Sequence, residues 1–165
     1  MAADSVVITD INRGNILRLI QRNLDHNQAL VAGCRVTVEE LDFCNLDTLD
    51  ALINRGCLEG VEVILAADVV YNNDLTDAFF AAVHRLLSAP PCKTLLVALE
   101  KRYVFTTTEY DVVAPCYEYF LHRLDALTRD NPEAPASTCH GPRALHIHAT
   151  CLDHASFPQY FVHVP

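Results

Sequence analysis

The chain has 165 residues, about the length of a single domain, and 51% of them are hydrophobic, which is enough for a buried core and excludes a disordered tail. The formal net charge of −9 disfavours a direct nucleic-acid partner, because binding DNA or RNA requires clustered Lys and Arg. An acidic surface suits a cationic partner, such as a lysine-bearing segment of another protein.

The cysteines indicate a reducing compartment. They are odd in number, widely spread, and form no C-x2-C pair, and no signal peptide precedes them, so we expect an intracellular protein of the nucleus or cytoplasm. No stretch approaches the roughly 18 consecutive apolar residues of a membrane helix. We therefore expect no membrane partner, and we expect a monomer. The seven cysteines are Cys34, Cys44, Cys57, Cys92, Cys116, Cys139 and Cys151.

Apolar residues alternate between strand-like and helix-like spacing along most of the chain. In chain order, the expected elements are a strand at 5–10, a helix at 15–27, a strand at 34–43, a helix at 46–56, a strand at 61–71, a helix at 74–90, a strand at 92–102, a helix at about 111–127, and strands at 144–152 and 160–164. This order predicts an α/β fold, an open and mostly parallel sheet with helices on both faces. Prolines and polar residues make 128–143 a surface loop within one domain that spans 1–165.

Three of the expected strands end in an acid, at Asp10, Asp42 and Asp68, and Tyr71 follows the third. Ligands of open α/β sheets bind at the carboxyl edge of the strands, so these acids should line one shared crevice. Two structural alternatives stay open. Asp10 could cap the following helix, and Asp68 could cap or hydrogen-bond the loop that follows it while Tyr71 packs against the protein.

The strand ends resemble one known family. "VVITD", "VEELDF", "ILAADVVYNNDLTDAFF", "EKRYVF" and "FPQYF" occur in the order and spacing of the seven-strand S-adenosylmethionine-dependent protein-lysine methyltransferases. The most specific segment runs from Ala66 to Phe80 and contains Asp68-x-x-Tyr71. The resemblance covers essentially the whole chain, and it implies a Rossmann-like class I methyltransferase fold, S-adenosylmethionine as cofactor, and a lysine-bearing protein as substrate.

The resemblance also implies which residues hold the cofactor. Asp10 would bind the ribose hydroxyls, since one carboxylate accepts two hydrogen bonds, and Asp42 and Phe43 would flank the adenine. Phe43 stands where this family usually has Trp, so the stacking area would be smaller. Ala67 would leave room for the cofactor beside the strand end.

Asp68 and Tyr71 would form the catalytic lip where the methyl donor meets the lysine. The carboxylate would orient the ammonium and accept its proton through water, and the ring would offer a cation–π face. Glu100 and Arg102, on the next strand end, either shape this pocket or form an exposed surface pair of little energetic weight. We do not count them as catalytic.

The glycine-rich turn that follows the first strand in this family is absent. The five glycines form no G-x-G, and "VVITD" corresponds to the family's second strand. We therefore expect a partial domain that lacks the first strand, is clipped at its C-terminal end as well, and is inactive as written. The glycines are Gly14, Gly33, Gly56, Gly60 and Gly141.

A cluster of His and Cys near the C-terminal end offers a chemical alternative, a zinc site. Its members are Cys139, His140, His146, His148, Cys151 and His154. Cys139 and His140 are adjacent, and no C-x2-C or H-x3-H pair occurs with a second pair. We therefore expect surface histidines and no metal site.

Two other functions compete with the methyltransferase. A non-catalytic binding module derived from a methyltransferase would keep the lysine-recognising edge without the cofactor, and the missing glycine-rich turn favours it. A phosphoacceptor domain built around Asp68 is disfavoured, because these strand ends do not supply the paired acids and the lysine that such a site needs.

Overall fold

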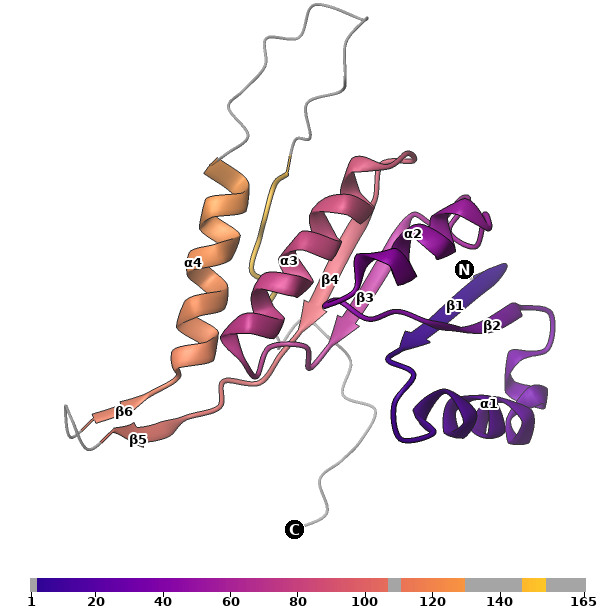
Figure 1. Ribbon diagram of the computed structural model, residues 1–165, viewed down its shortest axis with the longest axis horizontal. Helices are drawn as coiled ribbons and strands as arrows, with labels where there is room; N and C mark the ends of the chain where they lie inside the picture. The colour runs from indigo at the N-terminus through magenta and orange to yellow at the C-terminus, as the bar shows by residue number, and fades with distance from the viewer. Residues whose placement is uncertain (1–2, 107–110, 130–146, 154–165) are drawn as a thin grey trace, which may run out of the picture. The chain divides into compact units, whose positions relative to one another are not determined.

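Strands and helices alternate along the first hundred or so residues, much as the sequence predicts (Figure 1). The computed structural model describes residues 3–106, 111–129 and 147–153. In chain order its elements are β1 Ser5–Asp10, α1 Ile16–His26, the 3-10 helix η1 Gln28–Val31, β2 Arg35–Glu40, α2 Leu46–Asn54, β3 Val63–Ala67, α3 Asn73–Ser88, β4 Thr94–Ala98, β5 Val104–Thr106, β6 Asp111–Val113 and α4 Pro115–Arg129.

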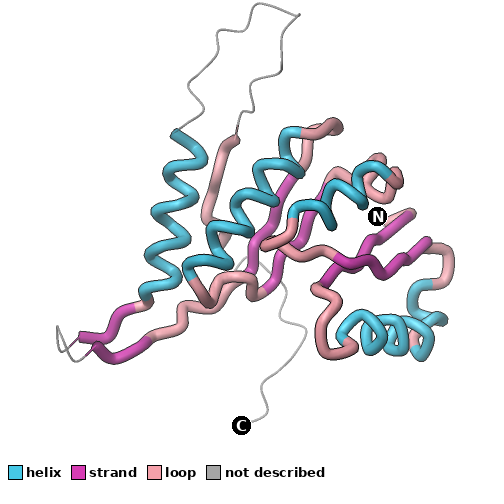
Figure 2. The backbone as a smooth tube through the Cα atoms, viewed as in Figure 1, coloured by secondary structure: helices cyan, strands magenta, loops and turns pink. Residues whose placement is uncertain are grey.

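The strands pair two by two (Figure 2). β1 and β2 are parallel, with Asp10 opposite Glu40, and β3 and β4 are parallel, with Ala67 opposite Ala98. β5 and β6 are antiparallel. The expected single open sheet is therefore not formed by the described strands, which make three separate two-stranded sheets. The interruption falls at the α2 crossover, and it leaves β1 and β3 each with one edge that has no strand partner within the described ranges.

The segment before α4 differs from the prediction. The helix expected from about 111 begins at Pro115, and residues 111–113 form strand β6 instead. Proline disfavours a helical conformation in the residue before it and is well suited to the first helical position, so Ala114 stays outside the helix. Strand β5, whose partner is β6, was not predicted at all.

Buried residues gather on α2, on α3 and at the start of α4, together with the loop after β3. They are Leu49, Leu52, Val70, Thr76, Phe79, Phe80, Ala82, Val83, Ala114 and Phe120. Ring contacts run from Phe43 to Phe79, from Phe79 to Phe80 and from Phe80 to Phe120, with centroids 5.4, 5.8 and 5.4 Å apart. These helices and this aromatic chain form the core of the described protein.

One face of the β3–β4 sheet is exposed. Side chains alternate along both strands, so Ile64 and Leu95 are half-buried while Leu65 is 75% and Leu96 is 39% exposed. Strands of parallel sheets normally bury both faces. This sheet therefore presents apolar side chains that a complete doubly wound fold would cover.

The chain forms two compact units, Met1–Phe120 and Leu121–Pro165. All strands of the described residues and the helices α1, α2 and α3 lie in the first unit, together with every predicted site residue. The described residues 147–153 contain no strand, so the strand expected at 144–152 is not seen there, and the strand expected at 160–164 lies outside the described residues. Among the described residues, no helix has the length and apolarity needed to span a membrane.

Candidate functional site

Asp10 ends β1 and does not cap the next helix. The N-cap of α1 is Asn15, whose side chain makes no capping hydrogen bond, so the capping alternative for Asp10 is wrong. One carboxylate oxygen of Asp10 accepts the backbone N–H of Ile11 at 2.7 Å, and the side chain is exposed. Asp10 therefore presents a carboxylate to solvent at the carboxyl end of the first parallel pair.

Asp42 lies just beyond the same end of that pair and shapes the turn into α2. Its Oδ1 accepts the N–H of Cys44 at 2.9 Å, and its own N–H donates to Thr48 Oγ1 at 3.0 Å. The helix itself begins at the N-cap Asn45, whose side chain accepts from Asp47 N. Asp42 thus has a structural role in the turn, and β1–β2 brings it to the same edge as Asp10.

The ring of Phe43 is half-buried and meets Phe79 edge-to-face, at an interplanar angle of 66°. This contact joins the residue after β2 to the aromatic core. An aromatic pair of this geometry contributes about 0.5–1.5 kcal/mol beyond its area burial. The ring predicted to lie against adenine is therefore also part of the packing, which fixes its orientation.

Asp68 ends β3 in an unusual backbone conformation. Its φ is 52°, in the left-handed region that costs a non-glycine residue about 1–3 kcal/mol and is often found at functional sites. Its N–H donates to the carbonyl of Ala98 at 2.8 Å. The N-cap of α3 is Asn72, which accepts from Asp74 N and Leu75 N. Asp68 is thus not the cap, and its carboxylate is free to point elsewhere.

That carboxylate meets the side chain of Arg102, which follows β4. Arg102 Nη2 donates to Asp68 Oδ2, and Cζ of the same guanidinium lies 5.8 Å from the centroid of the Tyr71 ring. Tyr71 is 52% exposed, so the alternative in which it packs against the protein is not what the structure shows. Asp68 and Tyr71 therefore lie on the same guanidinium, and their role at a catalytic lip stays a prediction. We call these two residues the cation site.

The sequence left open whether Arg102 shapes this pocket or forms an exposed surface pair, and it did not predict the contact with Asp68. The signal that could have found it is the register of the neighbouring strands, because Ala67 pairs with Ala98 and the residues that follow both strands emerge side by side. Ala67 itself is exposed at this end, with a side chain small enough to leave the strand end open. β1–β2 and β3–β4 are separate sheets, so the described pairing unites Asp10 with Asp42 but joins neither to Asp68.

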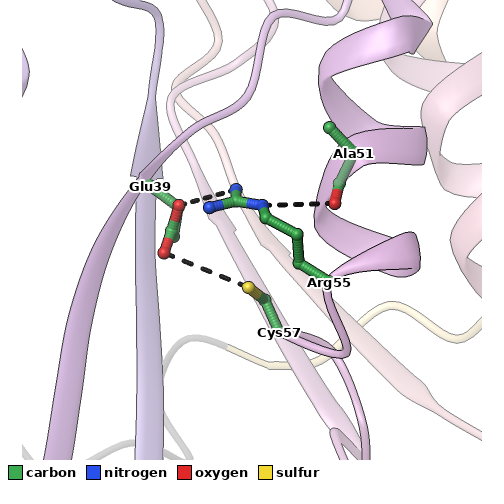
Figure 3. Close-up of polar contacts among 4 residues, drawn as sticks. All are labelled: Glu39, Ala51, Arg55 and Cys57. Atoms are coloured by element: carbon green, nitrogen blue, oxygen red, sulfur yellow. Dashed lines mark hydrogen bonds and ion pairs between the residues drawn. The ribbon is translucent and has the colours of Figure 1, made fainter.

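A second polar cluster, which sequence reasoning missed, lies between β2 and α2 (Figure 3). Arg55 donates to Glu39 at 2.8 Å and to the carbonyl of Ala51 at 3.3 Å, and Cys57 Sγ lies 4.0 Å from Glu39. The hydrogen bond to Glu39 and its negative charge raise the pKa of Arg55 above its ordinary value. The cluster ties the end of α2 to β2, which is a structural task.

A surface cavity of about 260 Å³ opens beside this cluster. It is lined by Glu40, Asp47, Thr48, Ala51 and Arg55. None of the predicted site residues lines it. The predicted site residues therefore lie at the strand ends and not in this cavity.

The zinc alternative falls mostly outside the described residues. Of its six members, the structure describes His148 and Cys151, and within the described ranges no group of three or more His, Cys, Asp or Glu could hold a metal ion. The prediction that the chain has no metal site stays a prediction.

Comparison with known proteins identifies the family. The family model described as "Lysine methyltransferase" matches residues 1–112. The chain belongs to the lysine methyltransferase family. It is 36% identical over 142 residues to methyltransferase-like protein 22 of Mus musculus, covering 77% of this chain and 35% of the relative. The corresponding Homo sapiens protein is 34% identical over 143 residues, covering 76% of this chain and 34% of the relative.

The family resemblance expected from the motifs is thus confirmed, including the particular similarity to methyltransferase-like protein 22. Membership in the lysine methyltransferase family also supports the expected Rossmann-like α/β fold. The chain spans about a third of the length of these relatives. No solved structure matches it.

The described residues fit one half of S-adenosylmethionine. Asp10 offers an exposed carboxylate at a strand end for the ribose, and the ring of Phe43, fixed by Phe79, offers a surface for the adenine. No turn of the G-x-G type occurs anywhere in the sequence for the methionine end. The chain's own residues therefore suit the nucleoside part of the cofactor and leave its sulfonium end without a backbone cradle.

Proposed function

We propose that this chain is part of a protein-lysine N-methyltransferase that uses S-adenosylmethionine. The observation that carries the proposal is the cation site, in which an exposed carboxylate and an aromatic ring flank a positively charged group. A lysine ammonium requires the same two kinds of contact. Membership in the lysine methyltransferase family supports this reading.

Asp68 orients the incoming ammonium and accepts its proton through a water molecule, because only the neutral amine is a nucleophile. Tyr71 packs against the methylene stem of the lysine and keeps water from it. S-adenosylmethionine, when bound, supplies the electrophilic methyl group. Asp10 holds the ribose, while Asp42 and Phe43 lie against the adenine.

Ala67 leaves room for the cofactor beside the end of β3. The protein's main contribution is to position the two reactants and to exclude water. A lysine-bearing protein is the substrate. We infer a monomer that works in a reducing compartment, the nucleus or the cytoplasm. The six cysteines of the described residues are free thiols, which is compatible with a reducing compartment.

A further parallel strand, carrying a glycine-rich turn at its carboxyl end, pairs with β1 and β3 and completes the site. The support is physical. Within the described ranges each of the strands β1 to β4 has a strand partner on one side only, and unpaired edges of apolar strands are unfavourable. The resemblance to the family, whose first strand lies between the counterparts of β1 and β3, selects these two edges.

The 165-residue chain alone binds S-adenosylmethionine weakly and does not turn over, because contacts to ribose and adenine leave the methionine end unheld. Isothermal titration and a thermal melt of this chain test the statement. Micromolar binding together with a sharp unfolding transition would show that the described strands suffice.

The decisive experiment supplies the missing strand. In a fusion protein, a strand with a glycine-rich turn at its carboxyl end, taken from a member of the lysine methyltransferase family, is joined to residue 1 of this chain. The fusion protein should transfer labelled methyl groups to lysine peptides, and backbone amides of β1 and β3 should become protected from hydrogen exchange. If the amides of β1 and β3 become protected but no methyl group is transferred, the enzymatic function is wrong, although the proposed strand pairing is right.

That last outcome would favour the second candidate, a non-catalytic module that binds lysine-bearing segments. The specific observation in its favour is that described residues form the cation site while the sequence contains no G-x-G turn. The two functions differ in one measurement. The module binds lysine peptides but not S-adenosylmethionine, so adding S-adenosylmethionine does not change its affinity for the peptides. The enzyme binds both the peptides and S-adenosylmethionine.

A further inference from the structure

The cation site already holds a cation, which the chain itself provides. Arg102 reaches it because Asp68 follows β3 and Arg102 follows β4, and the two strands run parallel in register. Its guanidinium pairs with the Asp68 carboxylate and lies over the Tyr71 ring. These are the two contacts assigned above to the substrate ammonium.

We propose that Arg102 is an internal occupant of the cation site, and that a substrate lysine must displace it to reach Asp68 and Tyr71. The inference rests on the proposed function of that site. It makes Arg102 a residue that sets the strength and selectivity of lysine binding, by competing for the site without touching the reacting atoms.

Exposure makes the exchange possible. The side chains of Arg102 and Asp68 are 46% and 56% exposed, so an incoming cation can enter and the guanidinium can leave into water. Exposed ion pairs and exposed cation–π contacts are each weak, up to about a fivefold change in an equilibrium constant. Arg102 therefore lowers lysine affinity modestly and does not close the site.

Lys101, the neighbour of Arg102, provides a matched control. Its ammonium lies 4.5 Å from the centroid of the Tyr117 ring, a different aromatic partner. Arg102→Met and Lys101→Met remove the same charge from adjacent positions in the chain, so both change long-range electrostatics similarly. Only Arg102→Met should empty the cation site.

The test measures the binding of Nα-acetyl-lysine methylamide by the NMR shifts of labelled tyrosine rings. It uses both the 165-residue chain and the fusion protein, so that a fold needing the added strand does not leave the result undecided. Arg102→Met should lower the dissociation constant roughly two- to tenfold relative to Lys101→Met. Arg102→Gln is the second variant, should the Met variant fold poorly, and the amide spectrum checks the fold of each.

Asp68→Asn separates this proposal from the proposed function. If Asp68→Asn weakens the probe while Arg102→Met binds no better than Lys101→Met, Arg102 is not an occupant, although the cation site stands. If Asp68→Asn binds the probe like the unchanged chain, or if Arg102→Met does not bind it, the cation site itself is wrong. If competition is the mechanism, the gain from Arg102→Met should disappear in the Asp68→Asn background.

Discussion

No residue from 3 to 48 is buried, whereas the chain from 49 to 120 contains every buried residue of the described ranges. The first parallel pair, β1–β2 with α1, thus rests on half-buried side chains. The second, β3–β4 with α2 and α3, lies beside the aromatic core. Each pair carries one proposed half of the site, the nucleoside side at Asp10 and the lysine side at Asp68.

The two acids differ in the same way as their surroundings. Among the partners that the described chain provides, the carboxylate of Asp10 accepts only the N–H of Ile11, while Asp68 is held in a left-handed conformation beside Arg102. The lysine side is therefore pre-organised by the packed half of the protein. The cofactor side depends on packing that the described residues do not complete, and this difference can be tested.

The largest effect should come from the aromatic core. Phe80→Ala removes a ring that is 5% exposed and contacts both Phe79 and Phe120, so it should lower the free energy of unfolding by about 3–5 kcal/mol. Leu19 lies on α1 and is 56% exposed, so Leu19→Ala should change the free energy of unfolding by less than about 0.5 kcal/mol. Urea unfolding measures both. Equal losses would show that the two halves are packed alike.

Asp68→Ala should have the next largest effect, on activity. In the fusion protein, losing the group that orients the amine and accepts its proton should reduce methyl transfer by about 10²-fold or more. The dissociation constant for S-adenosylmethionine should stay within about a factor of two, because the cofactor contacts are elsewhere. Rate assays and calorimetry test the split, and unchanged turnover would remove Asp68 from the mechanism.

Asp10→Ala should show the converse pattern with a smaller magnitude. The ribose hydroxyls would donate hydrogen bonds to the charged carboxylate of Asp10. Losing such bonds costs about 1.5–3 kcal/mol, so cofactor affinity in the fusion protein should fall roughly 10- to 100-fold. Binding of the lysine probe should not change. A loss of lysine binding instead would mean that the two acids share one crevice so closely that their roles cannot be separated.

The sequence predicted these elements well where local chemistry decides them. The β-branched run "SVVITD" gave the bounds of β1 correctly, and the motif around Asp68 and Tyr71 identified two residues that do come together. The helix start was wrong because the apolar spacing of Val112 continues into a helical pattern, while Pro115 decides where α4 begins. Local patterns carry such information and sometimes mislead.

Pairing between distant segments could not be predicted. The separation of β1–β2 from β3–β4 depends on tertiary structure, because one continuous sheet and two separate strand pairs fit the same hydrophobic pattern. The contact of Arg102 with Asp68 depends on strand register in the same way. Asn15 and Asn72 rather than Asp10 and Asp68 occupy the N-cap positions of the helices, a choice between neighbouring residues that composition leaves open.

The smallest effect should come from the ion pair that joins the two halves. Arg55, at the end of α2, bonds to Glu39 on β2 at 2.8 Å, and its side chain is 54% exposed, so Arg55→Met should leave overall stability nearly unchanged. It should, however, speed amide exchange in β2, where no residue is buried. Arg85→Met, which removes a similarly exposed arginine (57%) from its pair with Asp50 between α3 and α2, should not. At about 1 M salt the Debye length falls to about 3 Å, so exchange in β2 of the unchanged chain should approach that of Arg55→Met. If Arg85→Met speeds exchange in β2 as much as Arg55→Met, the two halves unfold as one unit, and the contrast in burial has no consequence for local stability.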